Sequence, residues 1–295
     1  MVEVGHFDTS PFATPDFNGC WGVYPYFESG LIVASDRQEG LFVLDFDKTY
    51  GAYLEGTITE EGTGFPLNDV TISIEGTAIT DESNVLGDYA TGISDNGTFD
   101  VTYSKLSYAP QTIPIDFETG EIALQDVILE KLPEFSVEIK VKDAITGVSI
   151  QDAEIKMKHT FTESQNLTDL FGKVEVPLYY EDNYEVIVGK WGYKTACATF
   201  FITEDTGEIT IYLTPGYYDD FAFINDWTIN GWATNGLWER GIPKGVTGPD
   251  GAIENPYFDA AFDCDEYAMI TGNNGITSGE EQVDNGVAIL MSPTL

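Results

Sequence analysis

Apolar and polar residues alternate at every second position along most of this chain. The alternation runs through VTISIEGTAIT (70–80), FSVEIKVKDA (135–144), YEVIVGKWGY (184–193) and EITIYLTP (208–215). Successive side chains of a strand point to opposite faces, so this period indicates half-buried β-strands. Turn sequences such as DNG and EDTGE interrupt the strands at intervals of about eight to twelve residues, and helical periodicity is nearly absent. The chain is therefore predicted to be all-β and built from β-sandwiches.

The middle of the chain contains an internal repeat. GTGFPLNDVTISIEG (62–76) aligns with ITGVSIQDAEIKMKH (145–159), and ETGEIALQDVILEKL (118–132) aligns with DTGEITIYLTP (205–215). Each copy extends at least from its first aligned segment to its second, over residues 62–132 and 145–215, and a stretch of that length fits one small sandwich. Pro133 marks the expected boundary between the two copies, and Pro215-Gly216 marks the end of the second.

The motifs of the second copy identify a family resemblance. TDLFGK (168–173), YEVIV (184–188) and WGY (191–193) follow the order found in carboxypeptidase regulatory-like domains, whereas the first copy has Ser107-Tyr108 in place of the Gly-Tyr pair. The resemblance implies two transthyretin-like sandwiches, at 54–133 and 134–217. It also implies a spacer role beside another domain, at times with a carbohydrate-binding-like fold, and no peptidase chemistry.

The beginning of the chain resembles a different family. WGVYP (21–25), SG (29–30) and IVASDRQEGLFVL (32–44) match the last blade of the LVIVD-repeat β-propellers of secreted choice-of-anchor B bacterial proteins. Residues 1–50 are therefore expected to form one terminal blade of an incomplete propeller, and the chain is expected to begin downstream of its real start.

The end of the chain resembles a third kind of module. DDFAFINDWTINGWATNGLWERG (219–241) and EEQVDNGVAILMSP (280–293) are similar to the first half of a MAM-like jelly roll of Bacteroidetes-type secreted proteins. Residues 218–295 are therefore expected to form a truncated jelly-roll sandwich.

Charge excludes several classes of partner. The chain has 13 Lys and Arg against 50 Asp and Glu, a formal net charge of −37. A surface this acidic repels phosphate backbones and anionic lipid, so neither nucleic acid nor a membrane surface is an expected partner. No apolar run is long enough to cross a membrane, and the first residues lack the pattern of a signal peptide.

The three cysteines, Cys20, Cys197 and Cys264, are far apart and form no CxxC pair. An odd number leaves at least one of them unpaired within the chain. The favoured interpretation is three isolated, small, buried residues; one disulfide remains an open alternative.

Candidate catalytic residues are scarce. The chain has only two histidines, His6 and His159, and none of the HExxH, GxSxG or P-loop motifs. His159 and Glu163 are four residues apart on one expected strand, hence about 13 Å apart and too distant to share a metal. We expect His159 to lie on a solvated strand and the chain to contain no catalytic residue and to require no cofactor.

The C-terminal region carries the candidate binding residues. The MAM-like resemblance implies a structural Ca²⁺ held by Asp219, Asp220 and Asp284, since calcium prefers oxygen ligands; the alternative is that these are turn and capping residues. Trp227, Trp232 and Trp238 are either sandwich core or faces for stacking on sugar rings.

These observations predict a non-catalytic fragment of a secreted or cell-surface bacterial protein. Its modules would act as spacers and in adhesion, with an extracellular glycan or protein as partner. The alternative is the accessory region of a secreted metallopeptidase whose catalytic domain lies outside this chain.

Overall fold

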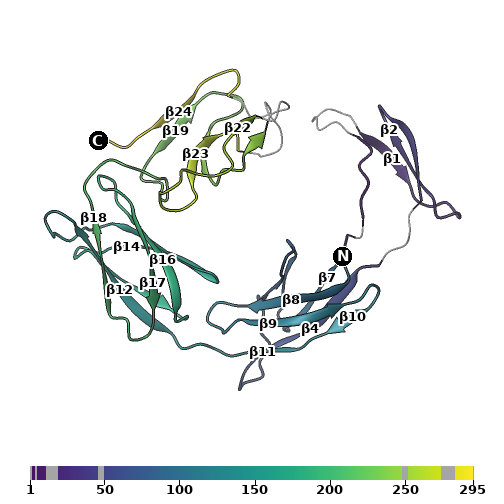
Figure 1. Cartoon of the computed structure of the whole chain (residues 1–295), viewed down its shortest axis with the longest axis horizontal. Helices are drawn as coiled ribbons and strands as arrows, with labels where there is room; N and C mark the ends of the chain where they lie inside the picture. The colour runs from purple at the N-terminus through teal and green to yellow at the C-terminus, as the bar shows by residue number, and fades with distance from the viewer. Residues whose placement is uncertain are drawn as a thin grey trace. The chain divides into compact units, whose positions relative to one another are not determined.

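A computed structural model describes residues 2–3, 5–10, 19–45, 50–247, 252–273 and 283–294. These residues form strands and connecting segments without a helix, so the prediction of an all-β chain is confirmed (Figure 1). The described residues therefore include no helix that is long and apolar enough to span a membrane. Parts of two expected modules lie outside the described residues. These are residues 11–18 and 46–49 of the expected blade, and residues 248–251 and 274–282 of the expected jelly roll.

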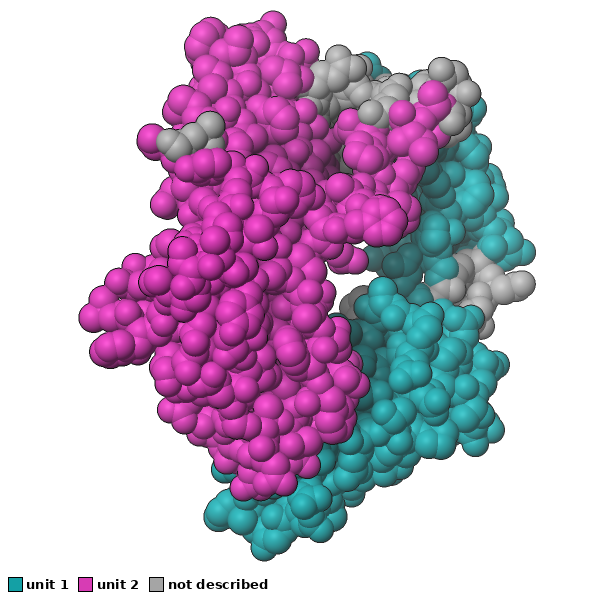
Figure 2. Space-filling view, turned by 60° about the vertical axis from the view of Figure 1, so that its left-hand side comes forward, with its two compact units in different colours: residues 1–132 teal, residues 133–295 magenta. Residues whose placement is uncertain are grey.

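The chain divides into two compact units, residues 1–132 and 133–295 (Figure 2). The division falls at Pro133, where the sequence places the boundary between its repeats.

The first strands form an antiparallel meander. They are β1 (Cys20–Tyr24), β2 (Ile32–Asp36) and β3 (Gly40–Leu44), in that order. Residues preceding the meander pack on one of its faces, where the Phe7 ring lies 5.6 Å from that of Phe42 and Thr9 donates a hydrogen bond to Asp36. The side chains of Leu41 and Val43 are exposed. Three strands belong to this sheet within the part of the chain that the structure describes.

The first repeat forms two sheets. In one, β4 pairs with β7 on one side and, in parallel, with β10 and β11 on the other; the second sheet has the order β6-β5-β8-β9. The bounds are β4 (Ala52–Glu60), β5 (Thr71–Ile74), β6 (Thr80–Glu82), β7 (Asp88–Ile93), β8 (Gly97–Ser104), β9 (Gln111–Phe117), β10 (Ile122–Leu124) and β11 (Val127–Leu129).

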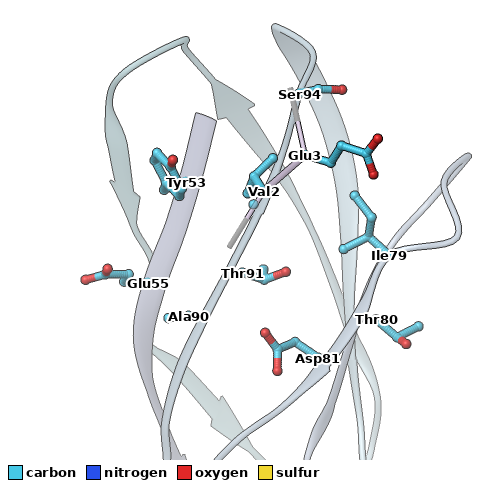
Figure 3. A pocket seen from close by; sticks show the side chains of 11 residues that line it. Val2, Glu3, Tyr53, Glu55, Ile79, Thr80, Asp81, Ala90, Thr91 and Ser94 are labelled. Carbon is cyan, nitrogen blue, oxygen red and sulfur yellow. The ribbon is translucent and has the colours of Figure 1, made fainter. Parts of the chain in front are cut away.

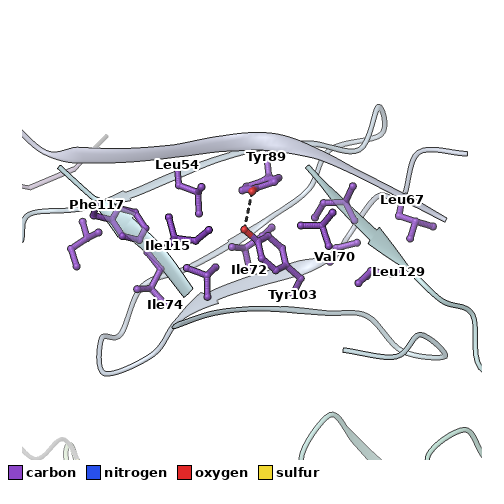
Figure 4. Packing of buried hydrophobic residues seen from close by; sticks show 14 of the residues in the cluster. Leu54, Leu67, Val70, Ile72, Ile74, Tyr89, Tyr103, Ile115, Phe117 and Leu129 are labelled. Carbon is purple, nitrogen blue, oxygen red and sulfur yellow. Dashed lines mark hydrogen bonds between the residues drawn. The ribbon is translucent and has the colours of Figure 1, made fainter. Parts of the chain in front are cut away.

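Apolar side chains from both sheets meet in one core (Figure 4). Leu54 and Leu129 from one sheet and Ile72 from the other are fully buried. Two tyrosines cross this core: the hydroxyls of Tyr89 and Tyr103 lie 2.9 Å apart, and Tyr89 donates to the carbonyl of Gln125. Buried hydroxyls need such partners, and burial raises the pKa of both tyrosines.

The second repeat has the same architecture. One sheet has the order β15-β12-β18 and the other β14-β13-β16-β17. The bounds are β12 (Phe135–Asp143), β13 (Glu154–His159), β14 (Thr162–Leu167), β15 (Lys173–Leu178), β16 (Asp182–Gly189), β17 (Ala196–Ile202) and β18 (Glu208–Leu213).

The aligned positions of the repeat perform the same structural tasks. Asp69 and Asp152 both adopt positive φ angles, of 50° and 52°. Ser83 donates to the carbonyl of Leu67 and accepts from the amide of Val70; Thr168 makes the corresponding bonds with Ile150 and Ala153. The similarity between the two segments therefore includes their buried polar contacts as well as their apolar residues.

The described residues in the last part of the chain form three two-stranded sheets, β19-β24, β20-β23 and β21-β22. The bounds are β19 (Thr228–Gly231), β20 (Trp238–Gly241), β21 (Val246–Thr247), β22 (Ile253–Asn255), β23 (Ala268–Thr271) and β24 (Ala288–Met291). We refer to residues 218–294 as the C-terminal module.

Candidate functional site at the covered face of the second sandwich

His159 lies in a setting different from the predicted one. A turn at Thr160 and Phe161 separates β13 from β14, so His159 and Glu163 belong to neighbouring strands and the single-strand prediction is wrong. The His159 ring is buried, stacked on Tyr180 and Tyr184 at 4.7 and 4.9 Å, so the prediction of a solvated strand is also wrong. The amide of Phe161 donates to its Nδ1. This histidine packs in an aromatic cluster.

The cysteine prediction is corrected as well. Cys197 on β17 and Cys264 in the C-terminal module form a disulfide across 67 residues, and Cys20 is exposed and free. The favoured interpretation of three isolated buried cysteines is therefore wrong. Spacing alone did not indicate this pair, because the tertiary structure brings the two residues together.

A buried group of charges lies on the same face of the sandwich. Lys156 and Lys158, both on β13, each donate a hydrogen bond to Asp265 of the C-terminal module. The Asp265 side chain is only 1% exposed and that of Lys156 5%. Burial raises the pKa of Asp265, but the hydrogen bonds from the two lysines outweigh that effect and hold the pKa below its ordinary 3.8.

Backbone and aromatic groups complete the surroundings of Lys156. Its Nζ donates to the carbonyl of Ala222 and lies 5.1 Å from the centre of the Tyr267 ring. Arg240 stacks on the same ring at 3.7 Å and also donates to the carbonyl of Ala222. Burial removes a cation from water at a cost in free energy, and the attraction between the cation and an aromatic ring face offsets part of that cost.

The apolar part of the contact is made by Phe223. Its ring packs where a side chain at Gly189 would stand: a Cβ there would lie 2.5 Å from the ring. Ile187, Ala222, Phe223 and Cys264 form one buried cluster. Glycine at 189 is therefore required by close packing.

The corresponding face of the first sandwich has a different chemistry. Ser73, Glu75, Thr102 and Thr112 stand in register where the second sandwich has Lys156, Lys158, Ile187 and Cys197. Thr102 and Thr112 bond to each other on an exposed surface. These four differences, together with Ser104 in place of Gly189, accompany the change from a solvated face to one that holds the C-terminal module, and sequence reasoning missed them.

The predicted calcium ligands are engaged by protein donors. Asp219 accepts hydrogen bonds from the amide of Phe221 and the side chains of Asn225 and Trp227. Asp220, which is buried, accepts from Thr195, Ala222 and Cys264, and burial raises its pKa above 3.8 despite those bonds.

The third predicted ligand, Asp284, forms a backbone bridge with Asn235. Among the described residues no three acidic, histidine or cysteine side chains are placed to hold one metal ion. As they lie here, Asp219, Asp220 and Asp284 do not fit a shared calcium site. Calcium binding stays a prediction for measurement.

The three candidate tryptophans have three different environments. Trp227 donates to Asp219 and lies edge-on to Trp191, so it is part of a packed cluster. Trp238 on β20 is half-buried, whereas Trp232 is 69% exposed. Only Trp232 of the three presents most of its ring to solvent.

A cavity of about 390 Å³ opens in the first unit between β4, β7 and the segment that contains β6 (Figure 3). Tyr53, Ile79 and Val2 line it together with the carboxylates of Glu55 and Asp81. No histidine, cysteine or basic residue is among the residues that line it. The cavity therefore offers no recognisable set of catalytic groups.

No protein-family model matches this sequence, and no curated protein matches it. Among solved structures, a Streptococcal ancillary pilin is 12% identical, with a TM-score of 0.36 over 68% of this chain and 76% of that chain. The minor pilin of Streptococcus agalactiae is 9% identical, at 0.34 over 57% and 98%. The Bacillus anthracis TIE protein is 14% identical, at 0.28 over 93% of this chain and 51% of that chain. At these identities and TM-scores the likeness does not place the chain in a family.

Proposed function

We propose that this chain is a non-catalytic spacer segment of a secreted or cell-surface bacterial protein. The observation that supports this most is the joint of the second unit, where a disulfide and a buried ion cluster join the second sandwich to the C-terminal module. Such a joint resists separation of the parts and performs no chemistry.

The disulfide also supports the proposed location. Disulfides persist in oxidising compartments and are rare in the cytosol of most organisms. A net charge of −37 adds solubility and disfavours contact with anionic surfaces. The spacer therefore belongs outside the cytoplasm.

The proposal is tested by pulling the whole chain between its ends in a single-molecule force experiment. We expect discrete rupture events, because each sandwich unfolds as a packed unit. The fully extended length of the oxidised chain should be about 220–240 Å shorter than that of the reduced chain. The disulfide prevents a loop of 67 residues, each about 3.3–3.6 Å long when extended, from contributing to the length. Gradual extension without ruptures, as for an unfolded chain, would contradict the spacer function.

An adhesive contact with a glycan is the second part of the proposal, and the exposure of Trp232 supports it. We expect Trp232→Ala to abolish retention of the protein on an immobilised polysaccharide, because the ring supplies the stacking face. Trp21→Ala is the matched control, since Trp21 is 73% exposed but lies in the first unit. Equal retention of both variants and the unmodified protein would remove the glycan contact and leave the spacer proposal intact.

A further inference from the structure

The outer edge of β17 lacks the features that usually protect an edge strand. β17 ends its sheet and pairs with β16 on one side only, within the part of the chain described here. From Thr195 to Thr203 the sequence TACATFFIT carries no charge and no proline. An exposed, uncharged edge of this length is a template for pairing with another strand.

The equivalent edge of the first sandwich is protected. β9 contains Pro114 and Asp116 in its short length. Proline removes a backbone donor, and a charge opposes burial against a second strand, so β9 is blocked and β17 is open. The difference lies between two copies of one repeat, and it sets β17 apart from the common architecture.

The sequence of β17 and its flanks is complementary to itself when read antiparallel about Thr199. Small residues at one end then face large ones at the other, and a cation faces an anion. The opposed residues are Lys194 with Glu204, Thr195 with Thr203, Ala196 with Ile202, Cys197 with Phe201, Ala198 with Phe200, and Thr199 with its own copy.

The faces of the strand agree with this register. Ile202 is buried and Phe200 half-buried on the core side, whereas Phe201 is 63% exposed on the other side. Residues opposed in an antiparallel pair share a face, so core-side residues meet core-side residues across the edge. Lys194 and Glu204 are both exposed and available for the ion pair.

We propose that two copies of this chain pair through β17, antiparallel and about a two-fold axis, to form one continuous eight-stranded sheet. This inference is independent of the spacer function. A self-complementary edge gives a closed, isologous dimer in which each contact occurs twice.

Charge makes the dimer dependent on salt. Each copy has a formal net charge of −37, so the copies repel each other over long distances while the uncharged strands attract at contact. The screening length falls from about 10 Å at 0.1 M salt to about 3 Å at 1 M. Sedimentation velocity over a range of protein concentrations should therefore show a dimer whose population rises with NaCl.

Variants of the whole chain, compared at one fixed ionic strength, test the register. Lys194→Glu and Glu204→Lys should each weaken dimerisation roughly tenfold, because two attractive contacts per dimer become repulsive. The double variant K194E/E204K should restore it. Thr199→Asp, which opposes two like charges at the axis, should abolish the dimer, whereas Thr112→Asp on β9 should leave it unchanged.

The proposal is overturned by a chain that stays monomeric at every concentration and salt level. It is equally overturned by a dimer that Thr199→Asp does not affect, that Thr112→Asp weakens to the same extent, or that the double charge exchange fails to restore.

Discussion

At the scale of single residues, the two copies of the repeat use positive φ angles at the same places. Ser107 has a φ of 69° where the second copy has Gly192 at 92°. Glycine adopts this region without strain, whereas other residues pay about 1–2 kcal/mol. The first copy therefore has the same backbone conformation at this position, but with Ser107 in place of the glycine that favours it.

Gly192→Ala should destabilise the second unit by about 1–2 kcal/mol. No atom lies within 4 Å of a Cβ at this position, so the loss comes from the backbone alone. Gly207→Ala is the control, because that glycine also has free space but does not adopt positive φ. Urea unfolding followed by tryptophan fluorescence measures both, since four of the five tryptophans belong to the second unit. Equal losses in the two variants would contradict the explanation by φ.

The buried hydroxyl of Thr168 offers a second residue-scale test. Thr168→Val should cost about 1–3 kcal/mol, because the amide of Ala153 and the carbonyl of Ile150 lose their partner in the interior. Thr168→Ser should lose less, since Ser83 performs this task in the first copy. The same urea titration compares them, and a serine variant as weak as the valine variant would show that the methyl group is the larger contribution.

At the scale of elements, the covered face of the second sandwich depends on one carboxylate between two lysines. Asp265→Asn should destabilise the joint by about 3–5 kcal/mol, because it leaves the buried Lys156 without its counter-ion and removes the carboxylate that also binds Lys158. The triple variant K156M/K158M/D265L should recover most of that loss, as apolar residues of similar size need no counter-ion. Thermal unfolding of the oxidised proteins measures this, and a triple variant no better than D265N would show that the contact needs its charges.

The same carboxylate makes the joint sensitive to acid. The pKa of Asp265 is lowered in the folded protein, so its stabilisation is complete above 3.8 and is lost as the pH falls through the folded value. Asp220 acts in the opposite sense: burial raises its pKa, so its ionisation costs stability as the pH rises from 3.8 through the raised value. Below pH 3.8 the unmodified protein should therefore lose more stability than K156M/K158M/D265L. Parallel losses in the two proteins would contradict this assignment.

At the scale of the whole molecule, the charge of −37 opposes the compact state by self-repulsion. Added NaCl should raise the melting temperatures of both units by screening. CaCl₂ at the same ionic strength separates screening from binding: a rise beyond that in NaCl, reversed by chelator, would support the predicted calcium ion by mass action on the folded state. Equal rises of the melting temperature in the two salts would contradict the predicted calcium ion at Asp219, Asp220 and Asp284.

The sequence by itself determined the all-β class, the strand periodicity and the repeat, in which Asp69 aligns with Asp152. These features follow from local rules: the alternation of side chains along a strand and the conformational preferences of residues in turns. Self-similarity between the copies then repeats the local result in the second copy.

Only the tertiary structure decided which distant residues meet. Cys197 and Cys264, or Lys156 and Asp265, are separated by many residues and carry no spacing signal, because their contact depends on how the module folds back onto one face of a sheet. His159 shows the same limit over a shorter distance: it lies on β13 at the same parity as the buried Ile155 and Met157, and the rings that stack on it, Tyr180 and Tyr184, come from a later part of the chain. Periodicity reports which face a side chain occupies, whereas the surface that covers that face is set by long-range packing.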